Sequence, residues 1–99
     1  MNFKEMQQHA GDAEQLLKAL ANANRLMILC TLAEGEHSVG ELNDRIDLSQ
    51  SALSQHLAVL RRDGLVATRR ESQTIYYSLS EGPAARVIDL LHDMYCGDA

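Results

Sequence analysis

The chain has 99 residues, which is within the usual size of one domain. Hydrophobic residues make up 45 % of it and charged residues 23 %, values that exclude a disordered tail. The formal net charge of −5 argues against a nucleic-acid-binding protein, because such proteins are usually basic. No apolar run has the length of a membrane span and the N-terminus has no secretory pattern, so we expect a cytoplasmic single-domain protein over 1–99, with no cofactor.

The net charge conceals one basic segment. Residues 1–47 and 78–99 carry net charges of −4 and −3, whereas residues 48–77 carry +2 through four arginines: Arg61, Arg62, Arg69 and Arg70. Local potential, rather than net charge, attracts a polyanion, so this segment is a candidate DNA surface. A solvated basic face would account for the same charges equally well.

Apolar residues at helical spacing predict two helices in the first third of the chain. The first covers about 12–21, with Asp12 as its N-cap. The second covers about 23–34 and is ended by Gly35.

Two further helices follow, each with a serine at its start. Ser38 and Glu41 have the spacing of a capping box and open a short helix. Ser49 opens a helix over about 50–62, which has an apolar stripe of three leucines.

After the fourth expected helix, the spacing of the apolar residues changes from that of a helix to a period of two, which is typical of a strand. The runs 65–69 and 74–79 predict a β-hairpin joined by RESQ at 70–73, which places arginines at its tip. Pro83 suits the first turn of a last helix over 83–96.

Three short helices followed by a hairpin predict a winged helix-turn-helix, mainly α with a small β-hairpin. The first and last helices, about 12–21 and 83–96, lie outside that unit, and one small domain cannot easily bury both. We therefore expect a homodimer through these helices. The expected interface residues are Leu16, Leu17, Leu20, Val87, Ile88, Leu91, Met94 and Tyr95.

The second helix of a helix-turn-helix enters the DNA major groove, and its N-terminal residues contact base edges. Here that helix begins with glutamine and serine, and glutamine can pair with adenine. A merely solvated face is the alternative, but such faces usually carry Lys and Glu. The candidate base contacts are Gln50, Ser51, Ser54 and Gln55, with His56 as a weaker candidate at the edge of the leucine stripe, and the four arginines of segment 48–77 are candidate phosphate contacts.

The two cysteines carry no motif of their own. Cys30 lies on an apolar helical stripe and Cys96 at the end of the last helix, with no CxxC. From position alone, two inert buried thiols are the simplest interpretation. Asp89, His92 and Asp93 share a helical face and could hold zinc, although a solvated face accounts for them better. Catalytic motifs are absent, which predicts a protein that is not an enzyme.

The stretch SVGELNDRIDLSQSALSQHLAVLRRDGLV (38–66), followed by TIYYSL (74–79), closely resembles the ArsR/SmtB family of winged-helix transcriptional repressors. The similarity extends through 16–32 and 88–96. It implies a homodimer that binds a pseudo-palindromic double-stranded DNA operator and is released by an inducer. It also implies that the glutamines and serines of 50–55 contact DNA, that 65–79 is the wing, and that the first and last helices form the dimer.

The resemblance also bears on what is sensed. Metal-sensing members carry Cys-x-Cys in the third helix, where this chain has ELN at 41–43. In the HlyU-like branch, the sensing groups are one cysteine in the second helix and one near the end of the last, and Cys30 and Cys96 match both. This implies a regulator that senses reactive sulfur species or oxidants through a cysteine pair. A metal-responsive repressor using Asp89 and His92, and a winged helix that binds protein, are the alternatives.

Overall fold

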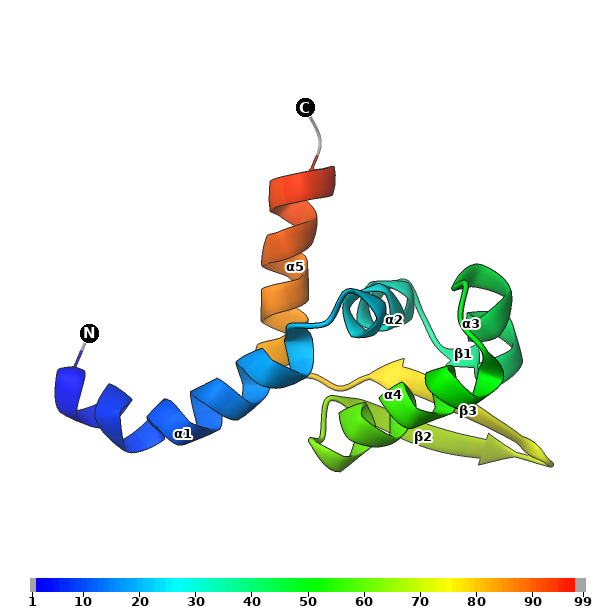
Figure 1. Ribbon diagram of the computed structural model, residues 1–99, viewed down its shortest axis with the longest axis horizontal. Helices are drawn as coiled ribbons and strands as arrows, with labels where there is room; N and C mark the ends of the chain where they lie inside the picture. Colours follow the sequence, from blue (N-terminus) through cyan, green and yellow to red (C-terminus); the bar gives the residue numbers. More distant parts are fainter. Residues whose placement is uncertain (1, 98–99) are drawn as a thin grey trace.

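The computed structural model describes residues 2–97 and shows five helices and a three-stranded antiparallel sheet over that range (Figure 1). In chain order the elements are α1 (Phe3–Leu20), α2 (Ala23–Ala33), β1 (His37–Ser38), α3 (Val39–Arg45), α4 (Gln50–Arg62), β2 (Val66–Glu71), β3 (Thr74–Leu79) and α5 (Pro83–Cys96). This confirms a mainly helical winged helix-turn-helix. Met1, Asp98 and Ala99, at the ends of the expected domain, lie outside the described residues.

The prediction for the first helix is wrong at its start. α1 begins at Phe3, and its N-cap is Asn2, whose side chain accepts a hydrogen bond from the backbone N–H of Glu5 at 3.1 Å. Asp12 therefore lies inside the helix. A single glycine, Gly11, does not break the helix, because an isolated glycine costs only about 1 kcal/mol relative to alanine.

The joint between α1 and α2 is held by Arg25, and the two helices meet at a bend of 89°. The Arg25 side chain donates from Nε to the Ala19 carbonyl at 2.6 Å and from Nη2 to the Lys18 carbonyl at 3.0 Å. Its backbone N–H donates to the Asn22 side chain at 3.0 Å, which caps α2. One residue thus satisfies carbonyls at the end of α1 and takes part in the cap of α2.

The helix-turn-helix itself forms as predicted. The capping box of α3 is present: Ser38 Oγ accepts from the Glu41 N–H at 3.2 Å, and the Glu41 carboxylate accepts from the Ser38 N–H at 2.8 Å. Ser49 caps α4 by accepting from the N–H of Ala52 at 3.1 Å. α4 ends at Arg62, and Gly64 follows with φ of +74°, a backbone conformation that favours glycine.

The hairpin is confirmed, but its tip is not where the sequence predicted. β2 extends to Glu71, so the turn consists of Ser72 and Gln73 alone, and Ser72 has φ of +56°. The arginines expected at the tip, Arg69 and Arg70, are residues of the strand. The connection predicted as RESQ is therefore half strand.

A third strand, β1, was not predicted. It pairs antiparallel with β3, so the strand order is β1-β3-β2 and the hairpin is extended into a small sheet. The strand contains only His37 and Ser38, too short for a period-two pattern to be recognised in the sequence.

The core is apolar and draws on every helix and on β2. On α4, Leu53, Leu57 and Leu60 are 0, 1 and 0 % exposed, which confirms the leucine stripe. Burial of each such side chain contributes about 1.5–3 kcal/mol. Two residues expected at a dimer interface, Leu20 and Ile88, also belong to this core at 5 and 2 % exposed, so they face their own chain.

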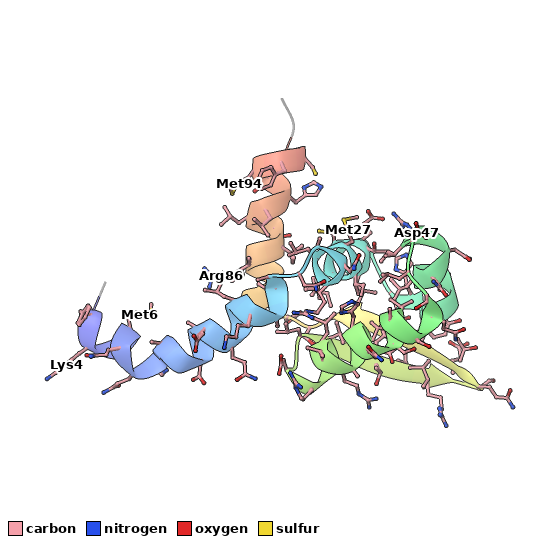
Figure 2. All side chains as sticks on the ribbon, in the orientation of Figure 1. Lys4, Met6, Met27, Asp47, Arg86 and Met94 are labelled. Carbon is pink, nitrogen blue, oxygen red and sulfur yellow. The ribbon has the colours of Figure 1, made fainter. Side chains whose placement is uncertain are left out.

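The first half of α1 and the last turns of α5 extend away from the body formed by α2, α3, α4 and the sheet (Figure 1). Exposed apolar side chains lie on these extensions: Met6 and Met94, labelled in Figure 2, are 46 and 60 % exposed, and Tyr95 is 78 % exposed. Of the other interface candidates, Leu17 is exposed, whereas Leu16, Val87 and Leu91 are half-buried.

By length and hydropathy, no single helix within residues 2–97 could cross a membrane. α1 and α2 meet those criteria only when taken together, and they are separated by the 89° bend.

Candidate functional site

The predicted base-contacting residues lie on one exposed face of α4. The buried leucine stripe of this helix faces the core, so the opposite side of the helix faces outward. This leaves Gln50, Ser51, Ser54 and Gln55 exposed in the first two turns, whereas His56 is half-buried. The face is polar, uncharged and built of short or medium side chains. It can present hydrogen-bond donors and acceptors at close approach to a partner.

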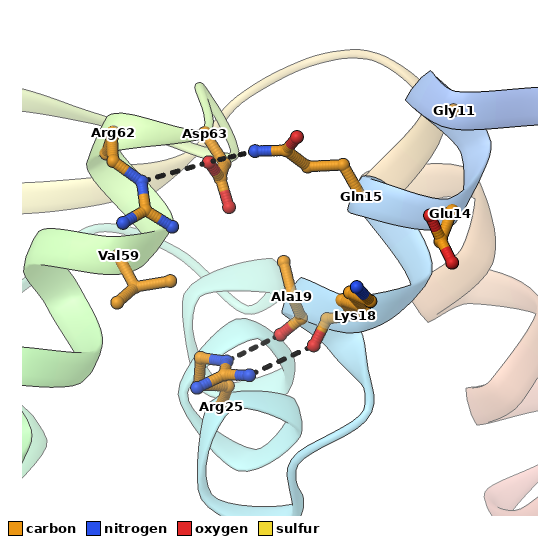
Figure 3. A pocket seen from close by; sticks show the side chains of 9 residues that line it. All are labelled: Gly11, Glu14, Gln15, Lys18, Ala19, Arg25, Val59, Arg62 and Asp63. Atoms are coloured by element: carbon orange, nitrogen blue, oxygen red, sulfur yellow. Dashed lines mark hydrogen bonds and ion pairs between the residues drawn. The ribbon is translucent and has the colours of Figure 1, made fainter. Parts of the chain in front are cut away.

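The two arginines that end α4 differ in their surroundings. Arg61 is exposed and makes no ion pair with any described residue. Arg62 Nε donates to the Asp63 carboxylate at 3.2 Å, and the same carboxylate oxygen accepts from Gln15 Nε2 of α1 at 3.2 Å (Figure 3). The hydrogen bond from Arg62, and then that from Gln15, lowers the pKa of Asp63 below its ordinary value.

Beside this contact lies a small cavity of about 210 Å³ between α1, the start of α2 and the end of α4 (Figure 3). Its charged residues include Lys18, Arg25, Arg62, Glu14 and Asp63, so charges of both signs are present. The Gln15–Asp63 contact was missed from the sequence, because nothing local signals a hydrogen bond between residues 48 positions apart.

Arg69 and Arg70, the two arginines of the wing, also differ in their ion pairs. The Arg69 guanidinium makes a bidentate ion pair with Glu36, with Nη2–Oε1 and Nε–Oε2 distances of 2.7 and 3.1 Å, and a further contact of 2.7 Å with Glu71. It also lies 4.8 Å from the centre of the Tyr76 ring. Arg70 is exposed and makes no ion pair within residues 2–97. Hydrogen bonds from Arg69 hold the pKa of Glu36 below its ordinary value.

The cysteines line one groove of about 580 Å³ between α2 and α5. Cys30 is half-buried, Cys96 is exposed, and both are free thiols. The remaining lining is mostly apolar, with three polar exceptions; in full it consists of Leu26, Met27, Ala33, Ile88, Leu91, Tyr95, Glu34, Asp89 and His92. The two sulfur groups that the resemblance singled out are thus brought to the same surface.

The environment of Cys30 disfavours its thiolate. Burial raises the pKa of the Cys30 thiol, and the charges of Cys96 and Glu34 raise it further. The acidic residue responsible for the third effect, Glu34, also forms an ion pair of 3.1 Å with Arg45 of α3.

The alternative metal ligands occupy the same groove. Asp89 and His92 line it together with both cysteines, and Asp93 lies next in the chain. Within residues 2–97, however, no three His, Cys, Asp or Glu side chains are grouped so that they could hold a metal ion.

Comparison with known proteins identifies the family to which the chain is similar. The family model described as "Bacterial regulatory protein, arsR family" matches residues 22–68, which run from the cap of α2 into β2. The chain is 58 % identical over 96 residues to the transcriptional activator HlyU of Vibrio cholerae, covering 97 % of this chain and 89 % of that protein. It is 50 % identical to the biofilm growth-associated repressor of Agrobacterium fabrum, covering 92 and 78 %.

A solved structure shows the same arrangement. That of reduced HlyU from Vibrio cholerae superposes with a TM-score of 0.89 at 57 % identity, covering 95 % of this chain and 99 % of that one.

Proposed function

This chain belongs to the arsR family of bacterial regulatory proteins and is a DNA-binding transcriptional regulator, and we propose that the thiols of Cys30 and Cys96 control its binding to an operator. The observation that carries the proposal is the groove between α2 and α5, which both cysteines line. That a relative was described in a reduced form agrees with redox control.

The chemistry needs one sulfur donor or oxidant and both thiols. A persulfide R–S–SH transfers its outer sulfur to one cysteine, which becomes Cys–S–SH while R–SH leaves. The second cysteine then attacks that cysteine's own sulfur, closing a disulfide and releasing H₂S. With a peroxide, the first cysteine becomes a sulfenic acid and the bridge closes with loss of water. A plain disulfide requires Cα atoms within about 7 Å, so a wider separation would require a longer sulfur chain.

Closing the bridge would alter DNA binding through the dimer. We propose that the exposed apolar residues of α1 and α5, including Leu17, Met94 and Tyr95, pack against a second copy of the chain. A bond from α2 to α5 would then shift the two α4 helices relative to each other. The half-sites of a palindromic operator lie about 34 Å apart, so a small shift in this spacing weakens binding.

The thiol mechanism is tested by titrating a labelled operator with the reduced protein, before and after treatment with glutathione persulfide or hydrogen peroxide. Cys30→Ser and Cys96→Ser should both bind DNA when reduced and fail to release it after treatment. Ala33→Ser adds a hydroxyl to the same groove but keeps both thiols, so it should still release DNA. Normal release by both cysteine variants would refute the mechanism.

The dimer is tested separately by sedimentation at micromolar concentration. The wild type should sediment as a dimer, and Tyr95→Asp with Met94→Asp should shift it toward the monomer by placing charge on an apolar surface. Gln73→Asp adds a negative charge at the exposed hairpin turn, outside α1 and α5, and serves as a control. A wild-type monomer at this concentration would remove the proposed interface.

A further inference from the structure

The two adjacent arginines of the wing lie on opposite faces of the sheet. Side chains alternate along a strand, so Val66 and Arg70 share one face while Arg69 and Glu71 share the other. Val66 is 4 % exposed and packs in the core with the leucines of α4. Arg70 is therefore on the face that carries α4, near the tip of the hairpin, and Arg69 is on the far face.

On that far face, the Arg69 side chain crosses the sheet. Its cross-strand neighbour on β3 is Tyr76, and its guanidinium lies over the Tyr76 ring. Beyond β3, Tyr76 pairs with Ser38 of β1, and the guanidinium reaches the Glu36 carboxylate just before that strand. Arg69 thus connects β2, at one edge of the sheet, to the chain entering β1, at the other.

The bidentate ion pair between Arg69 and Glu36 is called the clamp below. Glu36 meets the guanidinium side-on with two oxygens, the geometry that fixes orientation as well as distance. Glu71 occupies a further donor, Nη1, at 2.7 Å. A phosphate would have to displace a carboxylate from Arg69, whereas the Arg70 guanidinium makes no ion pair with any described residue.

We propose that Arg69 does not contact DNA but is a positioning residue, and that its clamp with Glu36 holds the wing so that Arg70 can meet a phosphate. The proposal rests on the DNA-binding function of the family and is independent of the cysteines. It assigns a role to Glu36, an acidic residue whose charge alone would only repel DNA.

Salt dependence separates a phosphate contact from a positioning residue. The logarithm of the binding constant falls with the logarithm of the salt concentration, with a slope set by the number of phosphates neutralised, about 0.9 for each phosphate. Arg70→Gln should therefore flatten this slope by about 0.9 for each phosphate that the arginine neutralises in the wild type. Arg69→Gln alone should weaken operator binding about two- to fivefold, the modest effect of an exposed ion pair. In the Arg70→Gln background it should change neither the affinity nor the slope further, because a positioning residue acts only through the contact that it positions. A slope that flattens by a further increment of about 0.9 when Arg69→Gln is added to Arg70→Gln would show that Arg69 neutralises a phosphate of its own, and would overturn the proposal.

Glu36→Gln gives the second test. If Glu36 only repels phosphate, the substitution should raise the affinity for DNA, and if Glu36 positions the wing, it should lower that affinity. Removal of a negative charge beside the wing should tighten DNA binding if Glu36 only repels phosphate. If Glu36 positions the wing, its loss should weaken operator binding about as much as Arg69→Gln, and the double variant should bind no worse than Arg69→Gln alone. Glu81→Gln removes the same charge from an exposed site outside the wing and serves as the control. Tighter or unchanged binding by Glu36→Gln, with the control unaffected, would overturn the proposal.

Discussion

Gln15 of α1 donates a hydrogen bond from Nε2 to the carboxylate of Asp63, 3.2 Å away, directly after the last residue of α4 (Figure 3). The side chain of Asp63 is only 10 % exposed, and its second partner is Arg62. This contact joins the helix proposed for dimerisation to the helix proposed to contact bases. The position of α4 therefore depends on that of α1 through the hydrogen bond between Gln15 and Asp63.

Asp63→Ala should lower the free energy of unfolding by about 1 kcal/mol, because it removes the acceptor shared by Gln15 and Arg62. Chemical denaturation monitored by circular dichroism measures this change. Asp44→Ala, at an exposed aspartate of α3, is the matched control and should have little effect. Equal stability of Asp63→Ala and the wild type would show that the contact does not hold α1 in place.

Acid should destabilise the protein through carboxylates that are hydrogen-bonded when folded. The pKa values of Glu36 and Glu41 lie below the ordinary 4.5, and that of Asp63 below 3.8, because each accepts hydrogen bonds. A lowered pKa stabilises the folded state above the unfolded pKa, and this contribution is lost as the pH falls through the folded value. The free energy of unfolding should thus decrease below about pH 4.5. Glu41→Gln should reduce this decrease, and a stability that stays constant down to about pH 3 would contradict the assignment.

The combined change Gln50→Ala and Gln55→Ala should weaken binding to the operator more than binding to random DNA. A well-placed bidentate contact to a base contributes about 1–3 kcal/mol of discrimination. Fluorescence anisotropy with both DNAs at one salt concentration measures the difference. Gln8→Ala, on α1 outside the proposed DNA surface, is the control for loss of an exposed glutamine amide. Equal weakening on both DNAs would show that the α4 glutamines do not contact bases specifically.

Glu34→Gln should speed alkylation of Cys30 by iodoacetamide at mildly alkaline pH. The charge of Glu34 is one of the causes that raise the pKa of Cys30, so its removal increases the fraction of thiolate, which is the reactive form. Mass spectrometry of quenched samples follows Cys30 separately from Cys96. Glu14→Gln, a change on α1 away from the cysteine groove, should leave the rate unaltered. A slower reaction in Glu34→Gln would mean that its carboxylate assists the thiol.

Elements with strong local signals were predictable from the sequence. Both ends of α4 match the expected 50–62, because a capping serine, a leucine stripe and Gly64 all act within a few residues. The start of α1 was not predictable, because the first turns of this helix are too polar to show apolar residues at helical spacing. The strand β1 was missed because two residues define no pattern, and its pairing with β3 is a long-range contact.

The candidate site was predictable only where a single helix creates it. The exposed face of α4 follows from helical spacing, whereas Arg69 and Arg70 are identical neighbours in the sequence. They differ only through strand register and through Glu36, which lies 33 positions away from Arg69. Likewise, spacing gave no reason to pair Cys30 with Cys96; the family resemblance did, and the fold places both in one groove.

The first turns of α1 have a thermodynamic consequence. Every residue from Phe3 to Asp12 is exposed, so this part of the helix contributes no side chain to the buried core of its own chain. An isolated helix of this length is marginal in water, and most helical stability in proteins comes from packing. The free energy that keeps these turns helical must then come from another surface, and it grows with the concentration of whatever supplies that surface. If a second copy does so, helix content becomes a function of the protein's own abundance: a scarce regulator would be partly unwound at its N-terminus, and an abundant one fully helical.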